Sequence, residues 1–297
     1  MSSESGDPDA PGLSADDAFA LVGDDTRIRI LRALADADGA LSFSELREQV
    51  GMRDSGRFNY HLDKLRGEFV TDAEDGYRLT RPGLRLVGSI LANAYTPVEG
   101  DASETATAEC ALCGSDATLT YRDSLLRVEC DTVEDHVWVS DLPPGARTHV
   151  DLPDLLDLGA RVNRQRGELA RTGTCPQCFG STTCEIVRSD EHPAPAFDEE
   201  DHEYFFRATC DRCSYPIGGL VGSLVTPHPA VVAAYHDVGV DVREEVQLPH
   251  EREPPAVESD DPLRLRIDVE HPEAGDRLVS VVVDEAGSVV DVEESGE

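Results

Sequence analysis

The sequence predicts an α+β protein with a helical N-terminal domain and a longer, β-rich C-terminal domain. Three observations support this fold class. Residues 24–80 contain three short amphipathic segments followed by two strand-like segments. Two Cys-x-x-Cys motifs lie in the second half of the chain, in a spacing that metal sites use. Residues 263–270 alternate apolar and polar side chains, and residues 276–284 are rich in valine and lead through a turn at 285–287 into 288–292, a pattern that predicts antiparallel strands.

The three amphipathic segments predict helices. The first ends near the acidic turn at 36–39, the second runs from Ser42 to Gly51 and the third from Ser55 to Arg66. Ser42 and Glu45 form a capping box at the start of the second helix. The apolar residues that recur at helical spacing, and that we expect to be buried, are Ile28, Leu31, Leu34, Phe43, Leu46, Val50, Phe58, Leu62 and Leu65.

The third helix has a second, polar face. Arg57, Tyr60 and Lys64 lie opposite its apolar side, and Arg53 lies just before it. Side chains of these types hydrogen-bond to base edges and phosphates when a helix enters the major groove. The helix therefore has the composition of a recognition helix.

A β-hairpin follows the third helix. Residues 69–80 form two strand-like segments around Asp75-Gly76, with Arg78 on the return strand. Three helices and a hairpin are the layout of a winged helix-turn-helix, in which the hairpin, or wing, lies along the phosphate backbone. Double-stranded DNA is the expected partner, and protein docking is the alternative.

The segments TRIRILRAL (26–34), LSFSELREQVG (41–51) and FNYHLDKL (58–65) resemble the ArsR-like winged-helix regulators of archaea. The resemblance covers residues 14–95 and implies that the third helix contacts DNA and that the protein is a homodimer. It adds Asn59 and His61 to the candidate contacts, although the angle of His61 on the helix fits packing equally well. The family's metal-sensing motif is absent, since residues 52–66 contain no cysteine.

A further helix is predicted at 84–95, beginning near Pro82, with an apolar stripe formed by Val87, Ile90, Leu91 and Ala94. In ArsR-like proteins the corresponding helix forms the dimer interface. Residues 96–107 are polar and acidic and predict a linker, and residues 1–13 predict a disordered acidic tail.

The charge of the chain argues against a nucleic-acid binder at first sight. There are 60 acidic and 26 basic residues, which gives a net charge of −34. Lys64 is the only lysine, and the acids are spread over the whole length, which is typical of haloarchaeal proteins that stay soluble in molar salt. An intrinsically disordered chain is the alternative, but the periodic apolar residues oppose it. Between Arg53 and Arg66 the sequence has four basic and two acidic residues, so the predicted recognition helix is locally positive.

The sequence has no apolar stretch of membrane-spanning length and no basic-then-apolar leader, so we expect a cytoplasmic protein. In a reducing compartment, cysteines bind metal more often than they pair as disulfides.

Cys175, Cys178, Cys210 and Cys213 form two Cys-x-x-Cys motifs separated by 31 residues. Two such motifs bring four thiolates around zinc in a zinc ribbon, predicted here at 173–216. The separation exceeds the usual spacing, which an inserted loop at 191–203 explains. A four-sulfur site is structural; redox-active thiols or a lost metal are the alternatives.

An incomplete copy of this pattern lies at 108–150. Cys110 and Cys113 are followed after 16 residues by Cys130, but Val133 stands where a fourth cysteine is expected. The remaining ligand could be His136, or a carboxylate from Asp131, Glu134 or Asp135. The alternatives are a degenerate ribbon that has lost its metal and a reversible metal sensor.

The rest of the C-terminal domain, 108–297, predicts a helix at 152–171, a short helix at 229–237 and an antiparallel sheet at 260–293. The helix at 152–171 carries Arg161, Arg164, Arg166 and Arg171, which predict a solvated face paired with acids, or else contacts to phosphates. From residue 108 onward the chain resembles an uncharacterised haloarchaeal domain often found after such winged helices, a resemblance that implies no activity.

No motif of an enzyme is found. The chain lacks a phosphate-binding glycine loop, a Gly-x-Ser-x-Gly elbow and a His-Glu-x-x-His motif. Six histidines are scattered among polar residues, and we expect them at the surface: His192, His202, His228, His236, His250 and His271.

The sequence thus predicts a dimeric, sequence-specific DNA-binding regulator with a structural zinc ribbon, and no enzyme. The alternative is an adaptor of the transcription machinery, because a winged helix followed by a zinc ribbon also resembles the archaeal counterpart of general transcription factor E.

Overall fold

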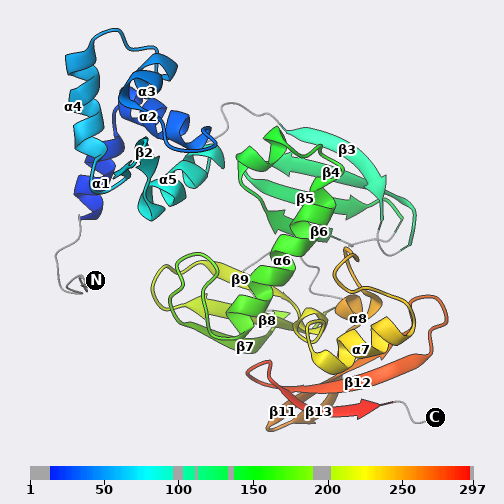
Figure 1. The fold of residues 1–297 in the computed structure, drawn as a ribbon. Coiled ribbons are helices and arrows are strands. Elements are labelled where there is room, and N and C mark those ends of the chain that lie inside the picture. Colours follow the sequence, from blue (N-terminus) through cyan, green and yellow to red (C-terminus); the bar gives the residue numbers. More distant parts are fainter. Residues whose placement is uncertain (1–13, 96–102, 111–112, 133–136, 190–201, 295–297) are drawn as a thin grey trace. The chain divides into compact units, whose positions relative to one another are not determined.

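The computed structural model divides into two units, residues 1–97 and 98–297, and it describes residues 14–95, 103–110, 113–132, 137–189 and 202–294. Both units combine helices with antiparallel strands, so the predicted α+β class is confirmed (Figure 1). The predicted tail, 1–13, lies outside the described residues. The boundary at Pro97 falls inside the predicted linker, but the first strand of the second unit already begins at Glu104, also inside it.

The first unit is mostly helical. Its elements are α1 (Ala15–Val22), α2 (Asp25–Ala35), α3 (Phe43–Gln49), α4 (Ser55–Leu65), β1 (Val70–Ala73), β2 (Gly76–Leu79) and α5 (Arg81–Leu91). The capping box at the start of α3 is confirmed, with the Ser42 side chain accepting from the backbone N–H of Glu45 and the Glu45 side chain accepting from that of Ser42. Helix α1 is an element that apolar spacing did not predict.

One hydrophobic core holds α2, α3, α4 and α5 together. Leu31, Leu46, Phe58 and Leu62 are fully buried in it, and the rings of Phe43 and Phe58 meet edge to face with centroids 5.0 Å apart. Eight of the nine residues predicted to be buried belong to this core or pack against it; Ile28 is half-buried on the same helix. Aromatic pairs in this geometry add to the stability that burial supplies.

The hairpin turn lies one residue earlier than predicted. Ala73 pairs with Gly76, so Glu74 and Asp75 form the turn and Gly76 begins β2. Glycine is required at position 76 because of a close approach and not because of the turn. A Cβ on Gly76 would lie 2.1 Å from the carbonyl oxygen of Leu41. The neighbouring Tyr77 exchanges two backbone hydrogen bonds with Leu41, which adds a third extended segment to the hairpin.

Helix α5 packs only one side against this core. Val87 is buried, whereas Leu84 and Leu91 are 57% and 52% exposed. On α1, Phe19 is 65% exposed. The described part of the first unit therefore displays large apolar side chains on its first and last helices.

The second unit contains three antiparallel sheets, ordered β3-β4-β5-β6, β7-β8-β9 and β10-β11-β12-β13. The strands of the first two sheets are β3 (Glu104–Glu109), β4 (Asp116–Arg122), β5 (Leu125–Cys130), β6 (Val137–Asp141), β7 (Thr182–Arg188), β8 (Tyr204–Cys210) and β9 (Pro216–Leu220). The third sheet consists of β10 (Ala256–Asp260), β11 (Leu263–Glu270), β12 (Arg277–Asp284) and β13 (Val289–Glu294). The helices are η1 (Pro144–Thr148), α6 (Leu155–Arg171), η3 (Val221–Leu224), α7 (Pro229–Asp237) and α8 (Pro249–Arg252).

Helix α6 joins the first two sheets. It contacts β5, β6, β7, β9 and η3, and Figure 1 shows it running from the β3–β6 sheet to the β7–β9 sheet. The β7–β9 and β10–β13 sheets share a second core, in which Phe206, Val225, Val281 and Tyr235 are buried. The predicted helix at 229–237 and the predicted strand at 263–270 are confirmed at their bounds.

A buried polar chain lies in this second core, and it corrects the expectation that His250 is a surface residue. The Tyr235 hydroxyl lies 2.8 Å from His250 Nδ1, His250 Nε2 lies 3.0 Å from Thr226 Oγ1, and Thr226 Oγ1 donates to Glu251 Oε1 at 2.7 Å. If Tyr235 donates to Nδ1 and Nε2–H donates to Thr226, then the two hydroxyls and the imidazole N–H each donate one hydrogen bond. Burial lowers the pKa of His250 to about 3 and raises that of Glu251.

Over the described ranges, no helix combines the length and the apolar composition needed to cross a bilayer.

Replacing Gly76 by Ala should destabilise the first unit by roughly 1–3 kcal/mol, because the added Cβ collides with Leu41 and the backbone has φ +143°. Gly67→Ala is the matched control, since Gly67 has φ +89° and no atom within 4 Å of the added Cβ. Hydrogen exchange of the Leu41 and Tyr77 amides reads out the change. Equal protection in the two variants would show that the close approach is unimportant.

Acid should destabilise the second unit through His250. Its pKa is about 6.5 when unfolded and about 3 when folded, so its stabilising contribution is complete above pH 6.5 and is lost as the pH falls towards 3. The expected slope is about 1.4 kcal/mol per pH unit in this window. His250→Gln should flatten the slope in denaturant unfolding, whereas His236→Gln, on the exposed side of α7, should leave it unchanged. The raised pKa of Glu251 makes the stability rise as the pH falls, which opposes the effect of His250, and it does so in both variants.

Candidate metal centre and candidate nucleic-acid interface

Four cysteines from two distant segments meet at the ends of β7 and β8. Their sulfurs all lie within 4.8 Å of one another, with 3.6 Å between Cys175 and Cys213 and 3.5 Å between Cys178 and Cys210. A tetrahedral site with zinc–sulfur bonds of about 2.3 Å requires sulfurs about 3.8 Å apart. The four residues could therefore bind a metal ion, and their arrangement is compatible with zinc.

Each Cys-x-x-Cys motif folds into the same turn. The N–H of Phe179 donates to the Cys175 carbonyl at 3.0 Å, and the N–H of Ser214 donates to the Cys210 carbonyl at 3.2 Å. Phe179 and Ser214 have φ +57° and +55°, a left-handed conformation that turns the chain back. The N–H groups of Gln177 and Arg212 point at the sulfurs of Cys175 and Cys210, at 3.4 Å each. Such donors stabilise thiolates.

Repulsion among the four cysteine sulfurs favours a bound cation. Backbone N–H groups of Cys213 and Arg212 lower the pKa of Cys210 to about 6. The pKa of Cys213 rises instead to about 12: the N–H of Tyr215 favours its thiolate, but burial and the three adjacent sulfurs outweigh that effect. Four thiolates at this spacing repel one another, and a bound divalent cation removes that repulsion.

The incomplete cluster has the same scaffold. Gly114, with φ +67°, donates to the Cys110 carbonyl at 3.0 Å, as Phe179 and Ser214 do in their motifs. Ala117 pairs with Cys130 across β4 and β5, and Thr182 pairs with Cys210 across β7 and β8. Ala117 and Thr182 each lie four residues after the second cysteine of the preceding motif. The predicted weaker copy is thus a structural repeat.

In this copy, the sulfurs of Cys110, Cys113 and Cys130 lie within 4.8 Å of one another. Ser115 adds a hydroxyl 2.9 Å from the Cys113 sulfur and 3.6 Å from that of Cys130. Val133, His136, Glu134 and Asp135 lie outside the described residues. Asp131 is described, and its carboxylate accepts a hydrogen bond from Thr118.

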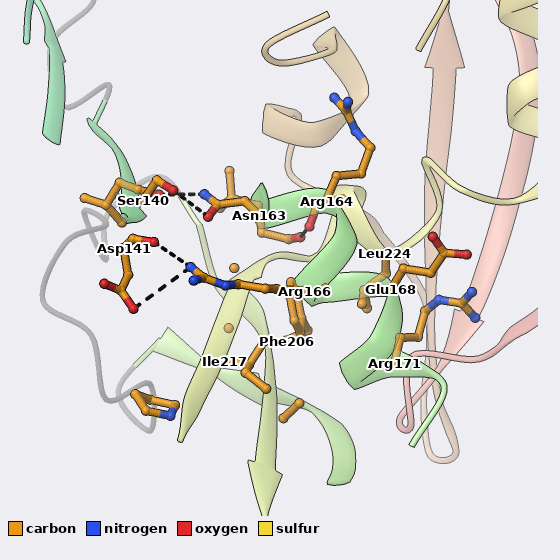
Figure 2. Close-up of a pocket in the computed structure, with 18 of the residues that line it drawn as sticks. Ser140, Asp141, Asn163, Arg164, Arg166, Glu168, Arg171, Phe206, Ile217 and Leu224 are labelled. Carbon is orange, nitrogen blue, oxygen red and sulfur yellow. Dashed lines mark hydrogen bonds and ion pairs between the residues drawn. The ribbon is translucent and has the colours of Figure 1, made fainter. Parts of the chain in front are cut away.

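The arginines of α6 do not form the predicted solvated row. Arg161 is exposed, but Arg164, Arg166 and Arg171 are partly buried and line a cavity of about 500 Å³ (Figure 2). Arg166 donates to the Asp141 carbonyl at 2.6 Å, and Arg164 donates to the Glu245 carbonyl at 2.7 Å. Arg164 and Arg166 therefore hold neighbouring segments in place. Helical periodicity alone could not indicate this role.

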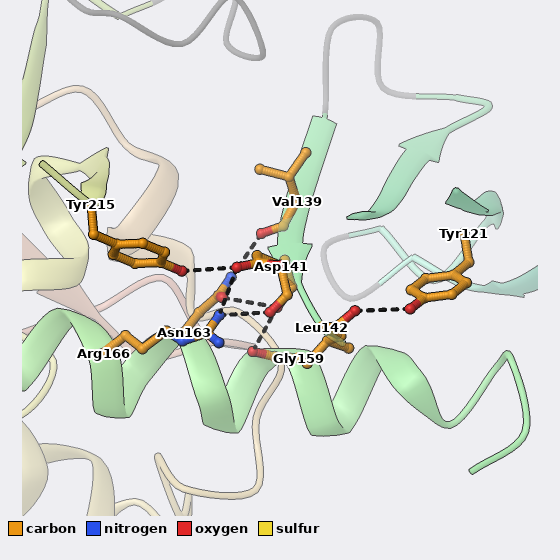
Figure 3. Close-up of polar contacts among 9 residues, drawn as sticks. Tyr121, Val139, Asp141, Leu142, Gly159, Asn163, Arg166 and Tyr215 are labelled. Carbon is orange, nitrogen blue, oxygen red and sulfur yellow. Dashed lines mark hydrogen bonds and ion pairs between the residues drawn. The ribbon is translucent and has the colours of Figure 1, made fainter. Parts of the chain in front are cut away.

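A polar cluster connects the four-cysteine site to α6. Two residues after Cys213, the Tyr215 hydroxyl donates to the Asp141 carboxylate at 2.9 Å, and Arg166 approaches the same carboxylate at 4.0 Å (Figure 3). Asn163 donates to the Val139 carbonyl at 2.7 Å. Burial and the Asp141 charge raise the pKa of Tyr215 to about 12, so it remains a donor.

The polar face predicted for the third helix lies on α4. Phe58, Leu62 and Leu65 are buried, whereas Tyr60 is 59% exposed. The other exposed side chains of the predicted contact set are those of Arg53, Arg57, Asn59, Lys64 and, on β2, Arg78. Among the described residues, none of these cations has a carboxylate within ion-pair distance. The Lys64 ammonium lies 5.8 Å from the centre of the Tyr60 ring, and Asn59 donates to Asp63.

His61 does not share this exposed face. Its side chain is buried at 6% exposure, and Nδ1 lies 3.4 Å from the Asp24 carboxylate at the start of α2. The packing alternative therefore holds for His61, because its angle on α4 turns it towards the core. Arg66 is likewise engaged, with ion pairs to Asp63 and Asp72 that join α4 to the hairpin.

Together these features define an α+β protein of two units with a four-cysteine metal-type site in the second. Residues 107–289 match the family described as "Domain of unknown function (DUF7351)", and since this is more than half of the chain, the protein belongs to that family. Residues 15–90 match a second description, "Domain of unknown function (DUF7347)". Neither a curated protein nor a solved structure matches the chain. The two matched ranges fall on either side of the boundary at Pro97.

The purified chain should contain one zinc ion, held by the four-cysteine site. Cys178→Ser should remove the ion and lower the unfolding temperature of the second unit, because three remaining thiolates bind zinc much more weakly. Cys184→Ser is the matched control: this cysteine is outside both clusters, and burial raises its pKa to about 11, which keeps it a neutral thiol. Metal analysis per chain distinguishes the variants. A Cys178→Ser protein that keeps its zinc would show that the site is elsewhere.

Proposed function

We propose that the protein is a sequence-specific, DNA-binding transcriptional regulator. The observation that carries the proposal is the two-sided character of α4, with a buried apolar face and an exposed face bearing Arg57, Tyr60 and Lys64. In a winged helix-turn-helix, this helix enters the major groove, where Arg and Asn side chains hydrogen-bond to base edges. Arg78 on the hairpin would contact the phosphate backbone.

The cations on the exposed face of α4 are not engaged by carboxylates of the described residues. The chain has 60 acidic residues against 26 basic ones, so carboxylates outnumber cations. Arg66, at the end of α4, pairs with two of them. Arg57 and Lys64 have none within ion-pair distance among the residues described. They are therefore available to phosphates or bases without first breaking an ion pair.

We further propose a homodimer. Leu84 and Leu91 on α5 and Phe19 on α1 are exposed apolar side chains, and burying them against a second copy would remove them from water. The resemblance to ArsR-like regulators implies the same helix as the dimer interface. Two recognition helices related by a twofold axis would read a palindromic site.

In the second unit, zinc would be held by Cys175, Cys178, Cys210 and Cys213, where it would stabilise the fold. Four sulfur ligands leave no open coordination position, so we propose no enzymatic role for this site. The incomplete cluster would be a degenerate copy. A reducing cytoplasm would keep these thiols available for metal.

DNA binding should depend on the exposed face of α4. Replacing Arg57 and Tyr60 together by Ala should weaken binding to the preferred site at least about tenfold, because groups that contact bases and phosphates are lost. The matched control is Arg161→Ala, an exposed helical arginine in the second unit. Electrophoretic mobility shifts measure the affinities, and circular dichroism checks that the fold is kept. Unchanged affinity in the double variant would remove α4 as the recognition element.

Crosslinking of the tagged protein to DNA across the genome of its own host separates the regulator from the alternative. A few sharp peaks over one palindromic sequence would support a specific regulator. A broad signal over most active promoters would instead favour an adaptor resembling the archaeal counterpart of general transcription factor E.

A further inference from the structure

The cavity beside α6 has the size and composition of a small-molecule site. Its volume is about 500 Å³, within the range of roughly 300–1,000 Å³ for ligand pockets. One part of its wall is apolar and is formed by Phe206, Ile217 and Leu224. Polar side chains of α6 line the same cavity (Figure 2). An apolar wall with a few polar groups is typical of sites for amphipathic ligands.

Most charged groups around the cavity are already engaged. Arg166 is bound to Asp141, Arg164 to backbone carbonyls, and Arg207 to Glu185 at 2.7 Å. The carboxylate of Glu251 accepts from Thr226 and from the N–H of Leu248. Glu168, also on the wall, is an exposed residue.

Arg171 is the exception. It is the last residue of α6 and lines the cavity, yet its Nε is buried without a hydrogen-bond partner. No described carboxylate lies within ion-pair distance of its guanidinium. Among the described residues, its terminal N–H groups have no acceptor either, so a ligand in the cavity can accept from them. The planar guanidinium matches a carboxylate, which can accept from two of its N–H groups at once.

We propose that this cavity binds a small amphipathic monocarboxylate, with its carboxylate on Arg171 and its apolar body against Phe206, Ile217 and Leu224. The cluster of Ser140, Asp141 and Tyr215 lines another part of the same cavity. Asn163, which contacts Ser140, is eight residues from Arg171, about 12 Å of helix rise. The inference is independent of the proposed DNA binding.

Isothermal titration calorimetry of the full-length protein with octanoate and phenylbutyrate tests this site, with octanol and phenylbutanol as uncharged partners of the same shape. We expect one acid bound per chain, and tighter binding of each acid than of its alcohol. Arg171→Gln should weaken binding of the acids about tenfold and leave the alcohols unchanged, because only the charge-assisted hydrogen bonds are lost. Arg171→Lys should restore part of the preference.

Two further variants locate the site. Arg161→Gln removes an exposed arginine from the same helix and should not change binding. Ile217→Trp should fill the apolar part of the cavity and abolish binding of acids and alcohols alike while the protein stays folded. The proposal is overturned if neither acid binds saturably, if acid and alcohol bind equally, or if Arg161→Gln weakens binding as much as Arg171→Gln does.

Discussion

The second unit depends on one long helix that two sheets share. The N-terminal half of α6 packs on the β3–β6 sheet through Leu155 and Leu156, and its C-terminal half reaches β7 and β9. Thr182, at the start of β7, donates to the carbonyl of Ala170 at 2.8 Å, which fastens the end of the helix to the strand. The first cysteine of the four-cysteine site follows four residues after the helix ends. A shift of α6 relative to the two sheets would therefore change the geometry of both the four-cysteine site and the cavity.

The repeated cysteine scaffold shows that the turn and the metal ligands are separable. Gly114, Phe179 and Ser214 each turn the chain in the left-handed region after the second cysteine of a motif, and each makes the same backbone hydrogen bond. In the first copy this turn persists beside only three clustered cysteines. The β3–β6 sheet is supported there by its own hydrophobic core, so its fold does not rest on a fourth sulfur. The second copy keeps all four cysteines, whose sulfurs lie within 4.8 Å of one another.

Patterns that are local in sequence predicted most of the fold. Helical spacing identified α2, α3 and α4, alternation identified β11, and two Cys-x-x-Cys motifs identified the four-cysteine cluster. Features that depend on distant residues escaped prediction. Gly76 resembles a turn glycine, but its role comes from Leu41, more than thirty residues earlier. His250 is surrounded by polar and charged neighbours in sequence, yet Tyr235 and Thr226 satisfy it in the core. The unpartnered Arg171 and the cavity beside it arise only when α6 meets two sheets.

The acidic composition limits how this protein can bind an anion, because its net charge is −34. At molar salt the screening length is about 3 Å, so long-range repulsion from the surrounding carboxylates is largely removed, and so is long-range attraction by the few cations. Counterion release also contributes less to affinity when the bulk already holds many ions. At molar salt, affinity for an anion therefore depends mainly on direct contact. A cation suited to such contact is already positioned and has no internal carboxylate as a partner. Among the described residues, Arg57 and Lys64 on the exposed face of α4 and Arg171 in the cavity lack an internal carboxylate, whereas Arg66, Arg166 and Arg207 are held by the protein's own acids.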